Sequence, residues 1–213
     1  MNRHERAPIG SGPFRFAAVP ITHSQPGART MPRGTGSPRV SIAMIMLIKA
    51  IELTLFPAVT AFAASSDLFT LTIANRVSII LVAGFSLLAA LTGIGMSDLL
   101  SHVGAAAVVL AVGFTFFAYG WIGGGDAKLA TATALWFGFT HLLDYLFYAS
   151  LFGGALTIAI FHFRRMPLPQ AFVLQPWTQR LHRSDSGVPY GIALVAAALL
   201  VYPHTRWMAA IGR

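Results

Sequence analysis

The sequence of 213 residues contains no cysteine. Disulfide bonds, zinc sites built from thiolates and cysteine nucleophiles are therefore excluded. Charged residues are scarce as well, at only 10% of the chain, whereas a soluble domain has about 25%. Because so few charges leave little surface for water to solvate, the composition excludes an ordinary soluble domain and indicates a membrane protein.

Apolar residues dominate instead, with 55% hydrophobic residues and a mean hydropathy of +0.67. A helix needs about 20 apolar residues to cross the hydrocarbon core of a bilayer, so the chain has room for about six spans. We therefore predict an all-α fold, a polytopic transmembrane helical bundle. The expected spans are 42–64, 77–95, 103–122, 129–142, 143–163 and 188–201.

Lysine and arginine in short loops predict the orientation, because they favour the cytoplasmic side. Alternate loops hold basic residues, whereas 97–102 and 141–144 hold neither lysine nor arginine. The basic loop residues are Arg76, Lys128, Arg164 and Arg165. Segment 164–187 is then a cytoplasmic or interfacial loop. Its part 170–183 is interpreted as a short interfacial helix or as a solvated loop with apolar anchors.

Residues 1–41 are rich in arginine, proline, glycine and serine and show no apolar period. Two explanations stay open: a disordered basic tail, or a start site assigned upstream of the true one. The domain proper is expected to cover 42–205. The net charge of +8 does not predict a nucleic-acid partner, because six of the fifteen basic residues are arginines in this segment.

Two aspartates are the main candidate site residues. Asp126 follows three glycines at the start of an apolar run, and Asp67 lies after the first run. The spans between them go out and back, so both should lie at the cytoplasmic face, where ionisable residues at span edges mark functional sites. Two carboxylates that share one proton can hydrolyse a peptide. The alternative is that each is only a polar residue at a helix end, such as an N-cap.

Other polar residues form weaker candidates. Asp98 with His102, and His141 with Asp144, are spaced so that each pair can share a helix face. Zinc requires at least three protein ligands, and the sequence offers no obvious third one, so we predict neither a metal site nor a cofactor. The sequence also lacks His-Glu-x-x-His and a convincing Gly-x-Ser-Gly in a span, which argues against zinc and serine proteases of the membrane.

The residues around both aspartates resemble the motifs of type IV prepilin peptidases. Residues 66–78 begin with Ser-Asp-Leu and end with Asn-Arg-Val-Ser, and they are similar to the first-aspartate motif of that family. Residues 123–128, Gly-Gly-Gly-Asp-Ala-Lys, are similar to the second motif, Gly-x-Gly-Asp-x-Lys. Residues 186–193 resemble the start of the last span in the branch that serves Flp (Tad) pili. One departure is Ala74, where family members usually carry proline.

The resemblance implies an aspartic-type endopeptidase that removes the cytoplasmic leader of prepilins by cleaving after a glycine. Larger members add a domain with four zinc-binding cysteines and methylate the new N-terminus. Because this chain has no cysteine, it resembles a peptidase-only form. Asp67 and Asp126 would be catalytic. The supporting motif residues would be Gly123, Gly125, Lys128, Asn75 and Arg76.

The implied location is the bacterial inner membrane, with several passes and the active site at the cytoplasmic face. The expected partners are a prepilin and the lipid bilayer, and self-association into a homo-oligomer is left open. Two other functions also stay open at this point, a small proton-coupled transporter and a non-catalytic factor in pilus assembly.

Overall fold

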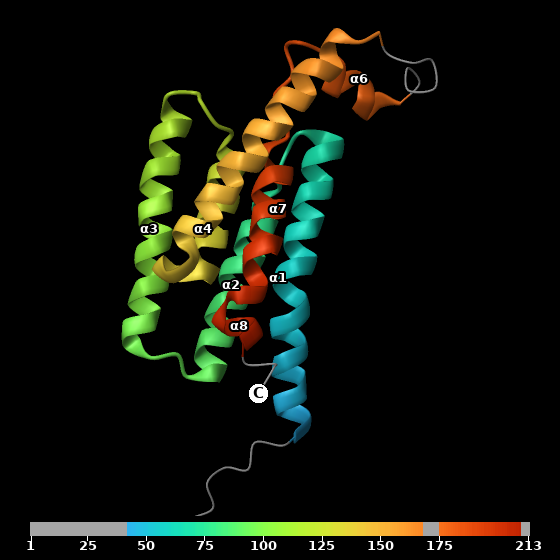
Figure 1. The fold of residues 1–213 in the computed structure, drawn as a ribbon. Helices are drawn as coiled ribbons and strands as arrows, with labels where there is room; N and C mark the ends of the chain where they lie inside the picture. Colours follow the sequence, from blue (N-terminus) through green and yellow to red (C-terminus); the bar gives the residue numbers. More distant parts are fainter. Residues whose placement is uncertain (1–41, 168–174, 210–213) are drawn as a thin grey trace, which may run out of the picture. The chain divides into compact units, whose positions relative to one another are not determined.

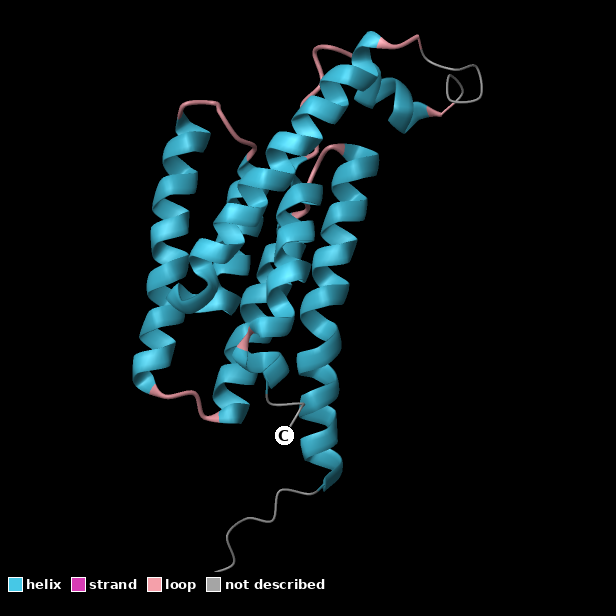
Figure 2. Ribbon diagram, in the orientation of Figure 1, coloured by secondary structure: helices cyan, strands magenta, loops and turns pink. Residues whose placement is uncertain are grey.

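The computed structural model describes residues 42–167 and 175–209, and within them helices are the only regular secondary structure (Figure 2). The predicted all-α fold is therefore confirmed. The described residues belong to one unit, Val40–Arg213, and the predicted tail 1–41 lies outside them. The elements in chain order are α1 (Ile42–Thr70), α2 (Asn75–Thr92), α3 (Met96–Ala118), α4 (Gly124–Arg165), α6 (Pro176–His182), α7 (Tyr190–Val201), η1 (Tyr202–His204) and α8 (Arg206–Ala209).

Helices α1 to α4 are long and apolar enough to cross a membrane. They carry large apolar side chains on their exposed faces, including Phe114 of α3 and Leu143 and Ile158 of α4. A soluble protein rarely exposes such continuous apolar surface, whereas hydrocarbon accommodates it as long as the backbone is hydrogen-bonded internally. The exposed apolar faces are those that a polytopic bundle presents to lipid.

The limits of the spans differ from the prediction. The expected spans 129–142 and 143–163 belong to one element, α4, in which the chain doubles back at Gly138 (Figure 1). The rings of Phe137 and Tyr145 lie 5.3 Å apart across this break, whereas eight residues of straight helix would separate them by about 12 Å. The expected sixth span corresponds to α7, which with 12 residues is short for a bilayer. The described residues form four helices that are long and apolar enough to cross a membrane and one short apolar helix, and the break divides the fourth long helix into two parts that run in opposite directions.

The break in α4 is stabilised by α3. Gly138 has φ 62° and ψ −177°, a region of conformation that is essentially restricted to glycine. The break leaves backbone groups without helical partners, which is costly inside a membrane. His102 donates its Nδ1–H to the carbonyl oxygen of Leu135 at 2.8 Å, and the Oγ of Ser101 accepts the N–H of Phe139 at 3.1 Å. Two polar residues of α3 therefore replace hydrogen bonds that the break removes.

We expect Gly138→Ala to destabilise the fold. A Cβ at this position would lie 3.2 Å from His102 Nδ1 and 3.3 Å from Ser101 Oγ, and the positive φ disfavours any side chain. The expected loss of unfolding free energy is about 1–3 kcal/mol, visible as a lower melting temperature in detergent. Gly154→Ala is the matched control in the same helix, because a Cβ at position 154 would meet nothing within 4 Å. Equal melting temperatures for the two variants would contradict this account of the break.

An aromatic cluster joins the end of the chain to the bundle. Phe56 of α1 stacks on Tyr202 of η1 with ring centroids 4.5 Å apart, and Phe85 of α2 packs edge-on against Trp207 of α8 at 5.7 Å. Trp207 also donates its Nε1–H to the carbonyl oxygen of Trp136 in α4 at 2.9 Å. Elements η1 and α8 are therefore part of the core. They lie at one end of the bundle (Figure 1). We call the other end, which holds the α1–α2 and α3–α4 loops, the motif end.

Candidate active site

Asp67 lies in the last turn of α1 and is 4% exposed. The prediction ended the first span at residue 64, but the helix continues to Thr70 and therefore includes the aspartate. The N–H of Leu71 donates to the carbonyl oxygen of Asp67 at 2.8 Å, and Leu71 has a positive φ of 53°. This conformation ends the helix and directs residues 71–74 across the motif end.

Asp126 lies in the first turn of α4, three residues after the N-cap Gly123. Its carboxylate interacts with the backbone N–H of Gly123. An acidic residue at this position commonly satisfies the N-cap amide in this way. A Cβ on Gly123 would lie 2.9 Å from the Oδ2 of Asp126, so a side chain at position 123 would displace the carboxylate.

The loop between α1 and α2 brings the two motifs into contact. A Cβ on Gly125 would lie 3.1 Å from the Cβ of Ile73, and a Cβ on Gly191 would lie 2.9 Å from the Cδ1 of the same residue. Glycine at position 125 therefore lets α4 approach the segment that follows Asp67. The carboxylates of Asp67 and Asp126 interact electrostatically. Two carboxylates held close together can share one proton, which is the arrangement that acid–base hydrolysis requires.

The supporting motif residues lie at the same end. Lys128 of α4 donates from Nζ to the Oδ1 of Asn75 in α2 at 2.9 Å. This hydrogen bond joins the beginnings of α2 and α4, and each partner belongs to one of the two aspartate motifs. Arg76 is exposed in the first turn of α2. The structure thus brings all seven predicted site residues to the motif end.

One contact of the site was not anticipated from the sequence. The backbone N–H of Gly191, in the first turn of α7, donates to the Oδ2 of Asp67 at 2.7 Å. The resemblance of residues 186–193 to a last-span start pointed to this segment. It could not identify the hydrogen bond, because a backbone donor has no signature in the sequence.

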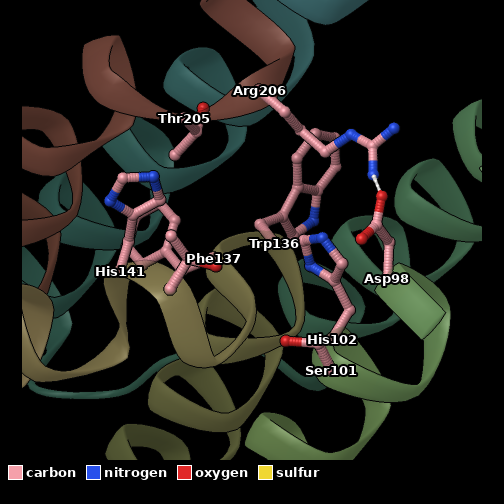
Figure 3. Close-up of a pocket in the computed structure, with 9 residues that line it drawn as sticks. Asp98, Ser101, His102, Trp136, Phe137, His141, Thr205 and Arg206 are labelled. Atoms are coloured by element: carbon pink, nitrogen blue, oxygen red, sulfur yellow. Dashed lines mark hydrogen bonds and ion pairs between the residues drawn. The ribbon is translucent and has the colours of Figure 1, made fainter.

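Three of the four remaining candidates, Asp98, His102 and His141, line a polar cavity of about 260 Å³ at the opposite end, and Asp144 is not among its lining residues (Figure 3). The ion-pair partner of Asp98 is Arg206, with 2.7 Å between Oδ2 and Nη1, and not His102. The Nδ1 of His141 lies 3.9 Å from the Oδ2 of Asp144. Among the described residues, no three histidine or acidic side chains are arranged to hold a metal ion.

Segment 164–187, predicted as a loop, contains the short helix α6. Arg164 donates to the carbonyl oxygens of Leu181 at 2.9 Å and Ser186 at 2.9 Å, so the segment is attached to the end of α4. Hydrogen bonds from Arg183 lower the pKa of the exposed Asp185 carboxyl. The predicted interfacial helix 170–183 is shortened to α6, and residues 168–174 lie outside the described residues.

Comparison with known proteins identifies the part of the chain that carries both motifs. Residues 54–158 match the model of the type IV leader peptidase family. They include Asp67 and Asp126 together with the hydrogen-bonded pair Asn75 and Lys128. This part of the chain is similar to the type IV leader peptidase family, and the match together with the four long apolar helices supports a membrane-bound peptidase. No curated protein and no solved structure matches the chain.

Proposed function

We propose that the protein is an aspartic endopeptidase that removes the leader peptide of type IV prepilins of the Flp (Tad) type. The observation that carries the proposal is that Asp67 and Asp126 lie at the same end of the bundle, where Ile73 of the loop after Asp67 packs against Gly125 next to Asp126. Both aspartates lie within the residues that match the peptidase family. The resemblance of residues 186–193 to the Flp branch supports the choice of substrate. The domain would cover 42–205, beyond the matched residues.

The chemistry follows from the two carboxylates. One of them, ionised, removes a proton from water, and the oxygen of that water attacks the scissile carbonyl carbon. The other, protonated, donates a hydrogen bond to the carbonyl oxygen and stabilises the negative charge that develops there. The tetrahedral species collapses when the amide nitrogen takes up a proton and leaves. Every step uses protons that the pair and the water supply, so no cofactor is required.

The proposed setting is the bacterial inner membrane, with the motif end at the cytoplasmic face. The motif end carries Arg76 and Lys128, and the end of α4 carries Arg164 and Arg165. Basic residues of this kind favour the cytoplasmic side. A prepilin inserted by its apolar helix would present its leader junction at the same membrane face. The substrate and the two carboxylates would then meet without crossing the bilayer.

A proton-coupled transporter is the main rival, and one observation favours it. Glu52 of α1 is 2% exposed and lies 3.3 Å from the Nζ of Lys49, and a buried acidic residue in a span is a common element of proton pathways. Fifteen residues of helix separate Glu52 from Asp67, which corresponds to about 22 Å. A single acidic residue at that distance is a weak relay, so we favour the peptidase.

The test is cleavage of an Flp-type prepilin by the full-length protein in detergent. We expect mass spectrometry to detect a shortened pilin whose first residue is the one that follows a glycine in the uncleaved prepilin. Asp98→Asn is the matched control, because this acidic residue is exposed at the opposite end and should retain most of the activity. Absence of cleavage in both detergent and native membranes would exclude the peptidase. Proton uptake by protein-containing liposomes would then support the transporter.

A further inference from the structure

The start of α7 contacts the carboxylate of Asp67 directly. Gly191 donates its backbone N–H to Oδ2 at 2.7 Å, although the two residues are 124 positions apart in the chain. The first N–H groups of a helix have no partner within that helix, so this amide is available for an acceptor from another element. Hydrogen bonds between an amide and a carboxylate are shorter and stronger than those between neutral groups. The contact therefore restrains one oxygen of Asp67.

The position leaves no room for a side chain. A Cβ on Gly191 would lie 2.7 Å from the Oδ2 of Asp67, 3.1 Å from its Cβ, and 2.9 Å from the Cδ1 of Ile73. The positive φ that often explains a glycine is not involved here. Glycine is needed because two groups of the motif end approach the backbone closely.

The second half of α4 holds the start of α7 in place. The hydroxyl groups of Tyr190 and Thr157 lie 2.8 Å apart. The Tyr190 ring also covers Gly153, where a Cβ would lie 3.1 Å from the ring. Because Tyr190 precedes Gly191, these contacts fix the amide that faces Asp67. The carboxylate is thus oriented relative to α4, the helix that also carries Asp126.

We infer that Gly191 is a positioning residue of the peptidase. Its amide holds the Oδ2 of Asp67 and leaves the other oxygen, Oδ1, for the attacking water and for Asp126. This inference rests on the proposed function. It extends the catalytic site to α7, outside the matched residues 54–158. Helix α7 therefore positions Asp67 for catalysis, in addition to packing against the bundle.

The test compares Gly191→Ala with Gly187→Ala, in full-length protein and with an Flp-type prepilin. A Cβ on Gly187 would meet nothing within 4 Å, so this control should keep wild-type kinetics. We expect Gly191→Ala to lower kcat by about 100-fold, because a displacement of about 1 Å at a reacting group has an effect of this size. KM should change by less than about threefold, since substrate binding does not use this amide. Both variants are measured below their melting temperatures.

A kcat of Gly191→Ala close to that of wild type would overturn the inference, and so would a loss confined to KM or to the folded fraction. The double variant with Ile73→Ala removes the Cδ1 contact but keeps the clash with Asp67, and it replaces the single variant if that one does not fold. Its kcat should stay at least about tenfold below that of Ile73→Ala alone. Recovery to the level of Ile73→Ala would assign the glycine to packing against the loop. If wild-type protein cleaves no prepilin, the proposed function fails, which is a different result from any of these.

Discussion

Asp67→Asn and Asp126→Asn will each reduce prepilin cleavage by roughly 10²–10⁴-fold, the contribution of a positioned acid or base. Asparagine keeps the shape of the side chain and can still accept the N–H of Gly191 or Gly123. It cannot take a proton from water or supply one to the scissile carbonyl. The measurement is the rate of leader removal at saturating prepilin, with equal amounts of inserted enzyme confirmed by immunoblot.

The control variants are Asp98→Asn and Asp144→Asn. Both residues are exposed; Asp98 lines the polar cavity at the opposite end, and Asp144 lies next to His141, which also lines it. Exposed ion pairs contribute little to stability, about 0–1 kcal/mol, so these variants should fold and cleave almost as wild type does. The pair assignment is wrong if Asp67→Asn retains a near wild-type rate, or if the controls lose as much activity as the site variants.

The common location of Asp67 and Asp126 follows from the order of apolar runs. Two spans between them return the chain to the same end, whatever the exact limits of those spans. The sequence likewise shows three glycines before Asp126, where the backbone carries no side chain, and the structure identifies Ile73 as the group that lies against Gly125. Both features depend on the local pattern of residues and on whether an even number of spans separates two positions. A single sequence contains this information.

The break in α4 could not be predicted in the same way. Gly138 is one of 20 glycines in the chain, and nothing local distinguishes it from Gly154, which stays helical. Its conformation is set by contacts with Ser101 and His102 on another helix. The ion pair between Asp98 and Arg206 and the hydrogen bond from Gly191 to Asp67 are also long-range contacts. Such contacts depend on how helices pack, and one sequence does not record that packing.

The second large effect concerns the membrane face on which the motif end lies. The chain has no native cysteine, so single cysteines can be introduced without a background signal. Thr70 ends α1 beside the site, and Ser184 lies between α6 and α7; both are exposed. Ser97 is exposed in the first turn of α3, at the opposite end. Ala127 and Ser101 are unsuitable for labelling. Ala127 is buried, and the Oγ of Ser101 accepts a hydrogen bond at the α4 break.

We expect an all-or-none labelling pattern with an impermeant maleimide. Thr70→Cys and Ser184→Cys should react in inside-out vesicles and stay unlabelled in intact cells, because basic residues favour the cytoplasmic side. Ser97→Cys should show the reverse, since the described residues place few basic side chains at the opposite end, and one of them, Arg206, is paired with Asp98. If Thr70→Cys labels from outside, the carboxylates face away from the compartment that holds a prepilin leader. Cleavage of such leaders by this site would then be impossible, however closely the motifs agree with the family.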